Sequence, residues 1–167
     1  SMKHTSPAGL GVANTLSQST LDIFGIDSSI NELSDCAVAF IKSRNCDPLS
    51  SYGDMICFSC KVDVQTAKLI KREVCDGVVA PDFDEEAIDI LKKKKNGKFI
   101  LIKIDKDYSD NIHNTGWTES KEMYGIKITQ PNNNFTLDSD IDLTETLDTS
   151  NIDSVIAYNI LKYTQSN

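Results

Sequence analysis

An amine and an imidazole lie side by side in the segment Lys3-His4-Thr5-Ser6-Pro7-Ala8-Gly9. Histidine titrates near neutral pH and can accept a proton from a reacting amine. Lysine can stabilise an oxyanion or protonate a leaving nitrogen. The pair Lys3-His4 therefore has the residue types of an acid–base site, and a solvent-exposed pair in a terminal segment is the alternative.

A C-x-x-C pair, Cys57 and Cys60, is the second candidate for chemistry. Zinc normally takes four ligands, and neither a second such pair nor a nearby histidine is present in the sequence. The pair also follows a strand-like run, whereas a thioredoxin-type motif opens a helix. We therefore interpret these residues as buried structural cysteines and expect no zinc.

We interpret two runs of charged residues and the second histidine as solvated surface residues without a catalytic or ligand-binding role. Lys92 to Lys95 resemble the solvated end of a helix, where basic residues complement the helix dipole. The aspartates between Asp138 and Asp148 lack the glycine and the terminal glutamate of an EF-hand, which favours a solvated loop. His113 lies among turn-forming residues and is interpreted as a surface histidine.

Helical and strand-like patterns alternate along the chain, which predicts an α/β layered sandwich. The helix that should carry Lys3 and His4 at its start begins at Pro7, after the cap residue Ser6. The expected helices cover about 7–24, 30–44, 63–74, 84–95 and 152–163, and the expected strands cover 54–59, 77–81, 99–104 and 121–129.

Length and composition set the broad class. The 167 residues predict a single α/β domain over 1–167, and the hydrophobic and charged fractions of 40% and 25% are typical of a soluble globular protein. The net charge of −8 argues against nucleic acid as a partner. No run approaches the ~20 apolar residues of a membrane helix. Five cysteines without a visible signal peptide indicate reduced thiols and a cytosolic protein.

Three further segments follow the Lys3–Gly9 segment in order. They are Leu49-Ser50-Ser51-Tyr52-Gly53-Asp54, Glu73-Val74-Cys75-Asp76-Gly77-Val78-Val79-Ala80-Pro81 and Lys162-Tyr163-Thr164-Gln165-Ser166-Asn167. Together the four segments resemble the transformylase part of the bifunctional AICAR transformylase/IMP cyclohydrolase family. The stretch from Glu85 to Gly97 fits the same pattern. The resemblance covers Lys3 to Asn167 and is weakest between Tyr108 and Thr149.

The resemblance implies an activity and a place in a longer protein. The family transfers a formyl group from the cosubstrate 10-formyltetrahydrofolate to the 5-amino group of AICAR, giving FAICAR, and a separate domain closes the ring to IMP. The transformylase region contains two cytidine-deaminase-like α/β subdomains, of which this chain resembles the first. The parent enzyme is expected to be a homodimer, and the isolated chain is expected to be inactive.

The resemblance also implies roles for individual residues. His4 matches the general base that acts on the AICAR amine, Lys3 matches the neighbouring transition-state stabiliser, and Asn167 matches the asparagine that orients the amine. The remaining matches are the AICAR-contacting positions Gly53 and Asp76, the folate-proximal positions Leu49 and Tyr52, and Thr164 and Ser166, in a segment that binds potassium in some members.

Two other classes of function stay open at this point. The chain could be a non-catalytic α/β binding or assembly domain in which the Lys3-His4 pair is incidental. It could also be a metal-dependent deaminase, but His4 is followed by Thr5-Ser6 and Ile56 precedes Cys57. The H-x-E and P-C-x-x-C signatures of zinc deaminases are therefore missing.

Overall fold

The computed structural model describes residues 1–14, 16–29, 32–105, 107–108, 118–133 and 152–164. The chain divides into two compact units, Ser1–Lys106 and Asp107–Asn167, and each unit is described by itself. A single domain over 1–167 stays a prediction.

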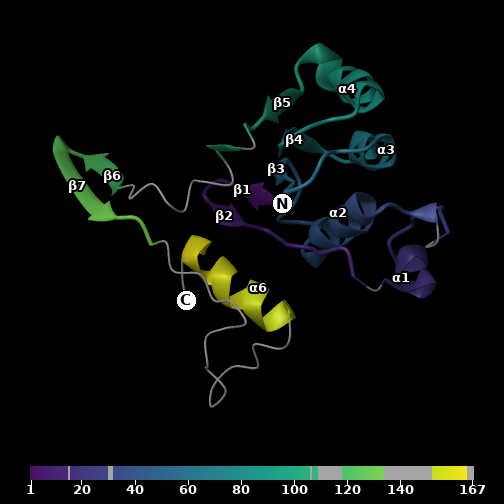
Figure 1. The fold of residues 1–167 in the computed structure, drawn as a ribbon, viewed down its shortest axis with the longest axis horizontal. Coiled ribbons are helices and arrows are strands. Elements are labelled where there is room, and N and C mark those ends of the chain that lie inside the picture. The colour runs from purple at the N-terminus through teal and green to yellow at the C-terminus, as the bar shows by residue number, and fades with distance from the viewer. Residues whose placement is uncertain (15, 30–31, 106, 109–117, 134–151, 165–167) are drawn as a thin grey trace. The chain divides into compact units, whose positions relative to one another are not determined.

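The first unit is built on a five-stranded sheet in the order β2-β1-β3-β4-β5 (Figure 1). The strands are β1 (Met2–Lys3), β2 (Ser6–Pro7), β3 (Asp54–Cys57), β4 (Cys75–Ala80) and β5 (Ile100–Lys103). Strands β3, β4 and β5 run parallel, while β1 is antiparallel to both of its neighbours. A mostly parallel sheet with intervening helices confirms the α/β class. The finer assignment to a cytidine-deaminase-like fold stays a prediction.

Three helices supply most of the apolar partners of this sheet: α2 (Asp35–Cys46), α3 (Val64–Arg72) and α4 (Glu85–Lys92). The side chains of Ser34 and Asp63 cap α2 and α3 by accepting a backbone N–H three residues later. The cap at Asp63 confirms the predicted start of its helix. The buried core joins strand and helix residues that include Phe40, Ile41, Ile56, Ala67, Ile70, Val78, Ala87 and Leu91.

Strand β5 exists where the sequence predicts it, but it is not fully buried. Its register with β4 pairs Val78 with Leu101, and Leu101 packs against the core. The alternate residues Ile100 and Ile102 are 50% and 44% exposed. Because side chains alternate between the two faces of a strand, only one face of this edge strand reaches the core.

The helix predicted over 7–24 is wrong in its first half. Ser6 and Pro7 form β2, and helix α1 covers only Gln18–Ile23, with Ser17 as its cap. The segment between β2 and α1 lies over α2. At Gly9 and Gly11 it is so close that a side chain at either position would collide with the α2 backbone. A Ser-Pro pair suits a helix start and also an edge strand, and this long-range packing selects the strand.

The second unit contains a hairpin and a helix. The strand predicted over 121–129 is two strands, β6 (Thr118–Met123) and β7 (Ile126–Pro131), joined at Tyr124 and Gly125 with φ values of 52° and 77°. Positive φ at both central residues is the geometry of a tight hairpin turn. Helix α6 (Ile152–Ile160) starts where the predicted helix starts and leads into the 3₁₀ turn η4 (Leu161–Tyr163), but its apolar residues, whose spacing predicts a core-facing helix, are not buried.

Some sequence predictions concern residues outside the described ranges, namely His113 and the aspartates between 138 and 148. In the ranges that are described, no helix combines the length and the hydropathy needed to cross a bilayer.

Candidate active site

The β1–β2 hairpin carries the Lys3-His4 pair. Lys3 pairs with Ser6 across the hairpin, which leaves His4 in a two-residue turn, exposed and with φ of 56°. A positive φ is uncommon for a residue with a side chain, and such strain is concentrated at functional sites. The turn therefore fixes His4 next to Lys3 in a backbone conformation that needs support from its surroundings.

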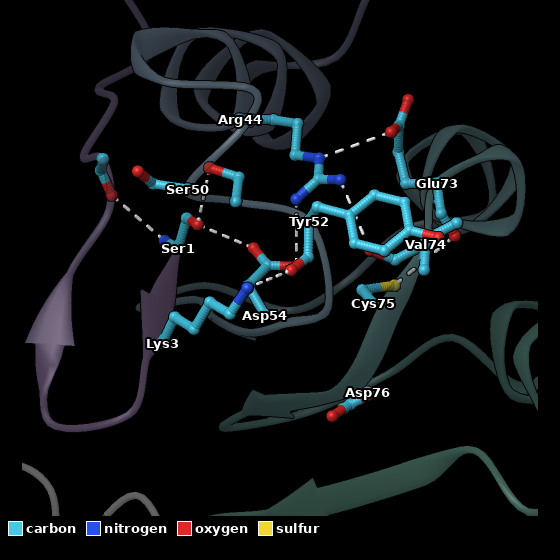
Figure 2. Close-up of polar contacts among 12 residues, drawn as sticks. Ser1, Lys3, Arg44, Ser50, Tyr52, Asp54, Glu73, Val74, Cys75 and Asp76 are labelled. Carbon is cyan, nitrogen blue, oxygen red and sulfur yellow. Dashed lines mark hydrogen bonds and ion pairs between the residues drawn. The ribbon is translucent and has the colours of Figure 1, made fainter.

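The Lys3 side chain connects this hairpin to a second sequence segment. Its Nζ donates to the backbone carbonyl of Tyr52 over 2.7 Å, and Figure 2 shows the side chain reaching toward that turn. An ammonium group has three donors, so two N–H groups remain for other acceptors. This contact brings together two segments that are 49 residues apart in sequence.

The turn before β3 contains three of the four predicted substrate- and folate-proximal residues. The side chains of Leu49 and Tyr52 are 88% and 61% exposed. Gly53 has φ of 77° and donates its N–H to the carbonyl of Val74 over 2.9 Å. A Cβ added to Gly53 would meet nothing within 4 Å, so the backbone conformation, not crowding, requires glycine here.

Asp76 lies on β4 with an exposed side chain that forms an ion pair with Lys95. Lys95 and Asn96 follow α4 in the 3₁₀ turn η2 (Lys94–Gly97), and both have positive φ, 47° and 53°. The lysines predicted as a solvated helix end thus leave the helix at Lys92, and one of them contacts a predicted substrate residue. A ligand that binds the Asp76 carboxylate would have to share it with Lys95.

Arg44 is the charged residue of this region that the sequence interpretation missed. It ends a helical face formed by Phe40 and Ile41, yet only 6% of it is exposed. Its Nη1 lies 3.1 Å from Oδ1 of Asp54, which is itself 1% exposed. The sequence did contain a signal for Arg44, since it lies three and four residues after Ile41 and Phe40 and therefore on their face of the helix. A charge on a buried helix face requires a buried partner.

The predicted potassium ligands and the trailing asparagine belong to the second unit or lie outside the described residues. Thr164 follows η4 and donates its hydroxyl to the carbonyl of Leu161 over 2.9 Å, which leaves the oxygen able to accept or ligate. Ser166 and Asn167 are outside the described residues. Potassium binding at Thr164 and Ser166, and the role of Asn167, therefore stay predictions.

The interpretation of Cys57 and Cys60 as buried is wrong, since both are exposed. Cys57 ends β3, where the next residues leave the sheet. Within the described residues, no group of three or more His, Cys, Asp or Glu side chains is arranged to hold a metal ion. The absence of zinc stays a prediction.

The five thiols are expected to differ sharply in reactivity. Burial raises the pKa of Cys36 to about 12 and the pKa of Cys75 to about 11, whereas Cys46, Cys57 and Cys60 are exposed. Because the thiolate is the nucleophile, iodoacetamide at pH 8 should modify the two buried cysteines about 100-fold or more slowly than Cys46. Peptide mass spectrometry of native and urea-unfolded chain measures this, and equal labelling of all five in the native state would contradict it.

Comparison with known proteins adds independent information. A family model described as AICARFT/IMPCHase bienzyme matches residues 1–167. A relative from Prochlorococcus marinus named bifunctional purine biosynthesis protein PurH is 31% identical over 170 residues, which cover 99% of this chain and 28% of the relative. A protein of the same name from Clostridium botulinum is 29% identical over 172 residues, with the same coverage of both chains. The chain thus spans little more than a quarter of the length of these relatives.

Proposed function

The chain belongs to the AICARFT/IMPCHase bienzyme family, and on this premise we propose that it is the first transformylase subdomain of a bifunctional purine-biosynthesis enzyme. In this proposal the parent enzyme moves the formyl group of 10-formyltetrahydrofolate to the 5-amino group of AICAR. The products are FAICAR and tetrahydrofolate.

The chemistry requires help at both nitrogens of the transfer. The 5-amino group of AICAR is a poor nucleophile because its lone pair is delocalised into the imidazole and the carboxamide. His4 accepts a proton from this amine as its nitrogen bonds to the formyl carbon. Lys3 stabilises the oxyanion of the tetrahedral intermediate and gives a proton to N10 of the folate as the carbon–N10 bond breaks. Holding both substrates in one geometry removes much of the entropic barrier.

The hydrogen bond from Lys3 Nζ to the Tyr52 carbonyl is the observation that supports this proposal best. It joins the proposed catalytic hairpin to the turn whose Leu49, Tyr52 and Gly53 are proposed to contact folate and AICAR. Asp76, proposed to accept from an amine or hydroxyl of AICAR, is the second residue of the neighbouring strand β4. The strained φ of His4 is consistent with a residue kept for its chemistry.

The proposal includes parts that this chain does not contain. A second subdomain and a homodimeric arrangement complete the transformylase site in the cytosol, and a separate cyclohydrolase domain closes the ring to IMP. From this chain itself, Asn167 orients the reacting amine. Potassium bound near Thr164 and Ser166 would stabilise that last segment.

The isolated 167-residue chain is expected to be inactive, because it lacks the second subdomain and the partner subunit. The full-length protein should form tetrahydrofolate from 10-formyltetrahydrofolate only when AICAR is added, as followed by absorbance and by chromatography of FAICAR. The same assay on the isolated chain should remain at the background rate. AICAR-dependent turnover by the isolated chain would overturn the expected inactivity, and its absence from the full-length protein would overturn the proposed function.

A further inference from the structure

A buried guanidinium links three segments beside the candidate site. Arg44, near the end of α2, contacts Asp54 at the start of β3 over 3.1 Å, as described above, and Oε2 of Glu73 over 3.3 Å. Its Nη2 donates to the carbonyl of Val74, also over 3.3 Å. Figure 2 shows the guanidinium between these groups. One side chain thus fixes the starts of two adjacent parallel strands relative to one helix.

This arrangement is costly unless every part of it is satisfied. A buried charge loses its hydration and requires paired, hydrogen-bonded partners. Arg44 and Asp54 are both more than nine-tenths buried. The planar guanidinium presents its donors in fixed directions, so its three acceptors cannot move independently. Two apolar side chains could fill the same space at a similar free energy of unfolding. We therefore attribute the Arg44–Asp54 pair to the fixed positions it gives the strand starts and not to a gain in stability.

The same contacts lead to Lys3. The Val74 carbonyl that accepts from Arg44 also accepts the N–H of Gly53 over 2.9 Å. The residue before Gly53 is Tyr52, whose carbonyl holds the Lys3 ammonium. Arg44 is therefore connected to the proposed catalytic lysine through the Val74 carbonyl, which precedes β4, and the peptide group between Tyr52 and Gly53.

We propose that Arg44 is a positioning residue, whose buried contacts with Asp54 and Val74 fix the turn before β3 and thereby the ammonium group of Lys3. It does not touch the substrates. The effect on catalysis rests on the proposed formyl transfer, whereas the effect on the turn does not.

The test uses a double variant, Arg44→Met with Asp54→Asn, which removes the two most deeply buried charges together and takes the Arg44 contact from only one other ion, the partly exposed Glu73 carboxylate. We expect it to melt within about 5 °C of the unchanged protein. The Gly53 amide should exchange with solvent at least about tenfold faster, while core amides of α3 such as Ile70 keep their rates. In the full-length enzyme kcat should fall about 10- to 100-fold with the KM for AICAR changed less than about threefold.

Two further variants make the test specific. Arg44→Lys keeps the charge but loses the planar fork, so it should also accelerate exchange at Gly53, and it serves if the double variant does not fold. The matched control is the exposed ion pair between Lys103 and Asp82, changed to Lys103→Met with Asp82→Asn. This control should alter neither the exchange rate of the Gly53 amide nor kcat.

The outcomes separate this inference from the proposed function. Unchanged Gly53 exchange in a folded Arg44 variant, or unchanged kcat in an active enzyme, overturns the positioning role. If the unchanged full-length protein shows no formyl transfer, the proposed function fails, and Gly53 exchange alone decides whether Arg44 positions the turn.

Discussion

Replacing His4 in the full-length protein is expected to lower kcat/KM for formyl transfer by about 10²- to 10⁴-fold, the usual contribution of a positioned general base. The delocalised amine of AICAR then has no side chain to accept its proton as the new bond forms. Binding of AICAR should change less than about threefold, because the proposed binding contacts lie at Gly53 and Asp76. Turnover is measured with the AICAR-dependent assay, and AICAR affinity by equilibrium binding.

The choice of substitution matters because His4 has φ of 56°. His4→Asn keeps a side chain that tolerates this conformation, whereas His4→Ala adds a backbone penalty to the loss of the base. Both variants should lose turnover to a similar extent. His113→Ala applies the same change to the other histidine of the sequence and is expected to leave turnover unchanged. Full turnover in His4→Asn would instead favour the non-catalytic binding domain.

Local sequence patterns predicted the elements whose structure is decided locally. The face of α2 with Cys36, Ala37 and Phe40 is buried as the helical spacing predicts. Asp63 caps α3, and Pro81 follows the end of β4. In each case a cap, a stop or a period within a few residues contains the information.

The errors occur where distant segments decide the structure. The sequence between Ser6 and Leu16 has the spacing of a helix start, but it packs as an extended segment over α2. The exposure of Ile100 depends on which face of β5 packs against the core, and the strand's own residues do not encode this because Ile100, Leu101 and Ile102 are all apolar. The interpretation of Cys57 and Cys60 as buried rests on the lack of further zinc ligands in the sequence, and that lack says nothing of where β3 leaves the sheet.

The candidate site shows the same division. The family resemblance supplied Lys3, Tyr52 and Gly53 as separate matches, and the fold adds the contact between the first two. Arg44 belongs to none of the matching segments. Only the combination of its charge with a buried helix face indicated a partner, and the identity of Asp54 as that partner required the sheet.

Gly11→Ala is the second change with a large expected effect, because this glycine lets the N-terminal segment lie against α2. An added Cβ would lie 2.6 Å from the Ser43 amide nitrogen and closer still to the Ala39 carbonyl oxygen, both of which are backbone atoms. Gly9 has the same restriction, and its carbonyl accepts the Ser43 hydroxyl over 3.0 Å. The segment holds the hairpin with Lys3 and His4 on the helix, so its displacement should affect both stability and turnover.

The sign of the change in the free energy of unfolding tests whether Gly11 lies against the α2 backbone. At a position with free space, a glycine-to-alanine change stabilises a protein by about 0.4–1 kcal/mol through the unfolded chain. Here the helix backbone cannot yield, so we expect a loss of about 1–3 kcal/mol in the free energy of unfolding, measured with urea. Ala13→Val, at an exposed position of the same segment, should change it by less than about 0.5 kcal/mol. A more stable Gly11→Ala chain would mean that the segment does not lie on α2, and the Lys3-His4 hairpin would then lose the support that this segment adds to its pairing with β3.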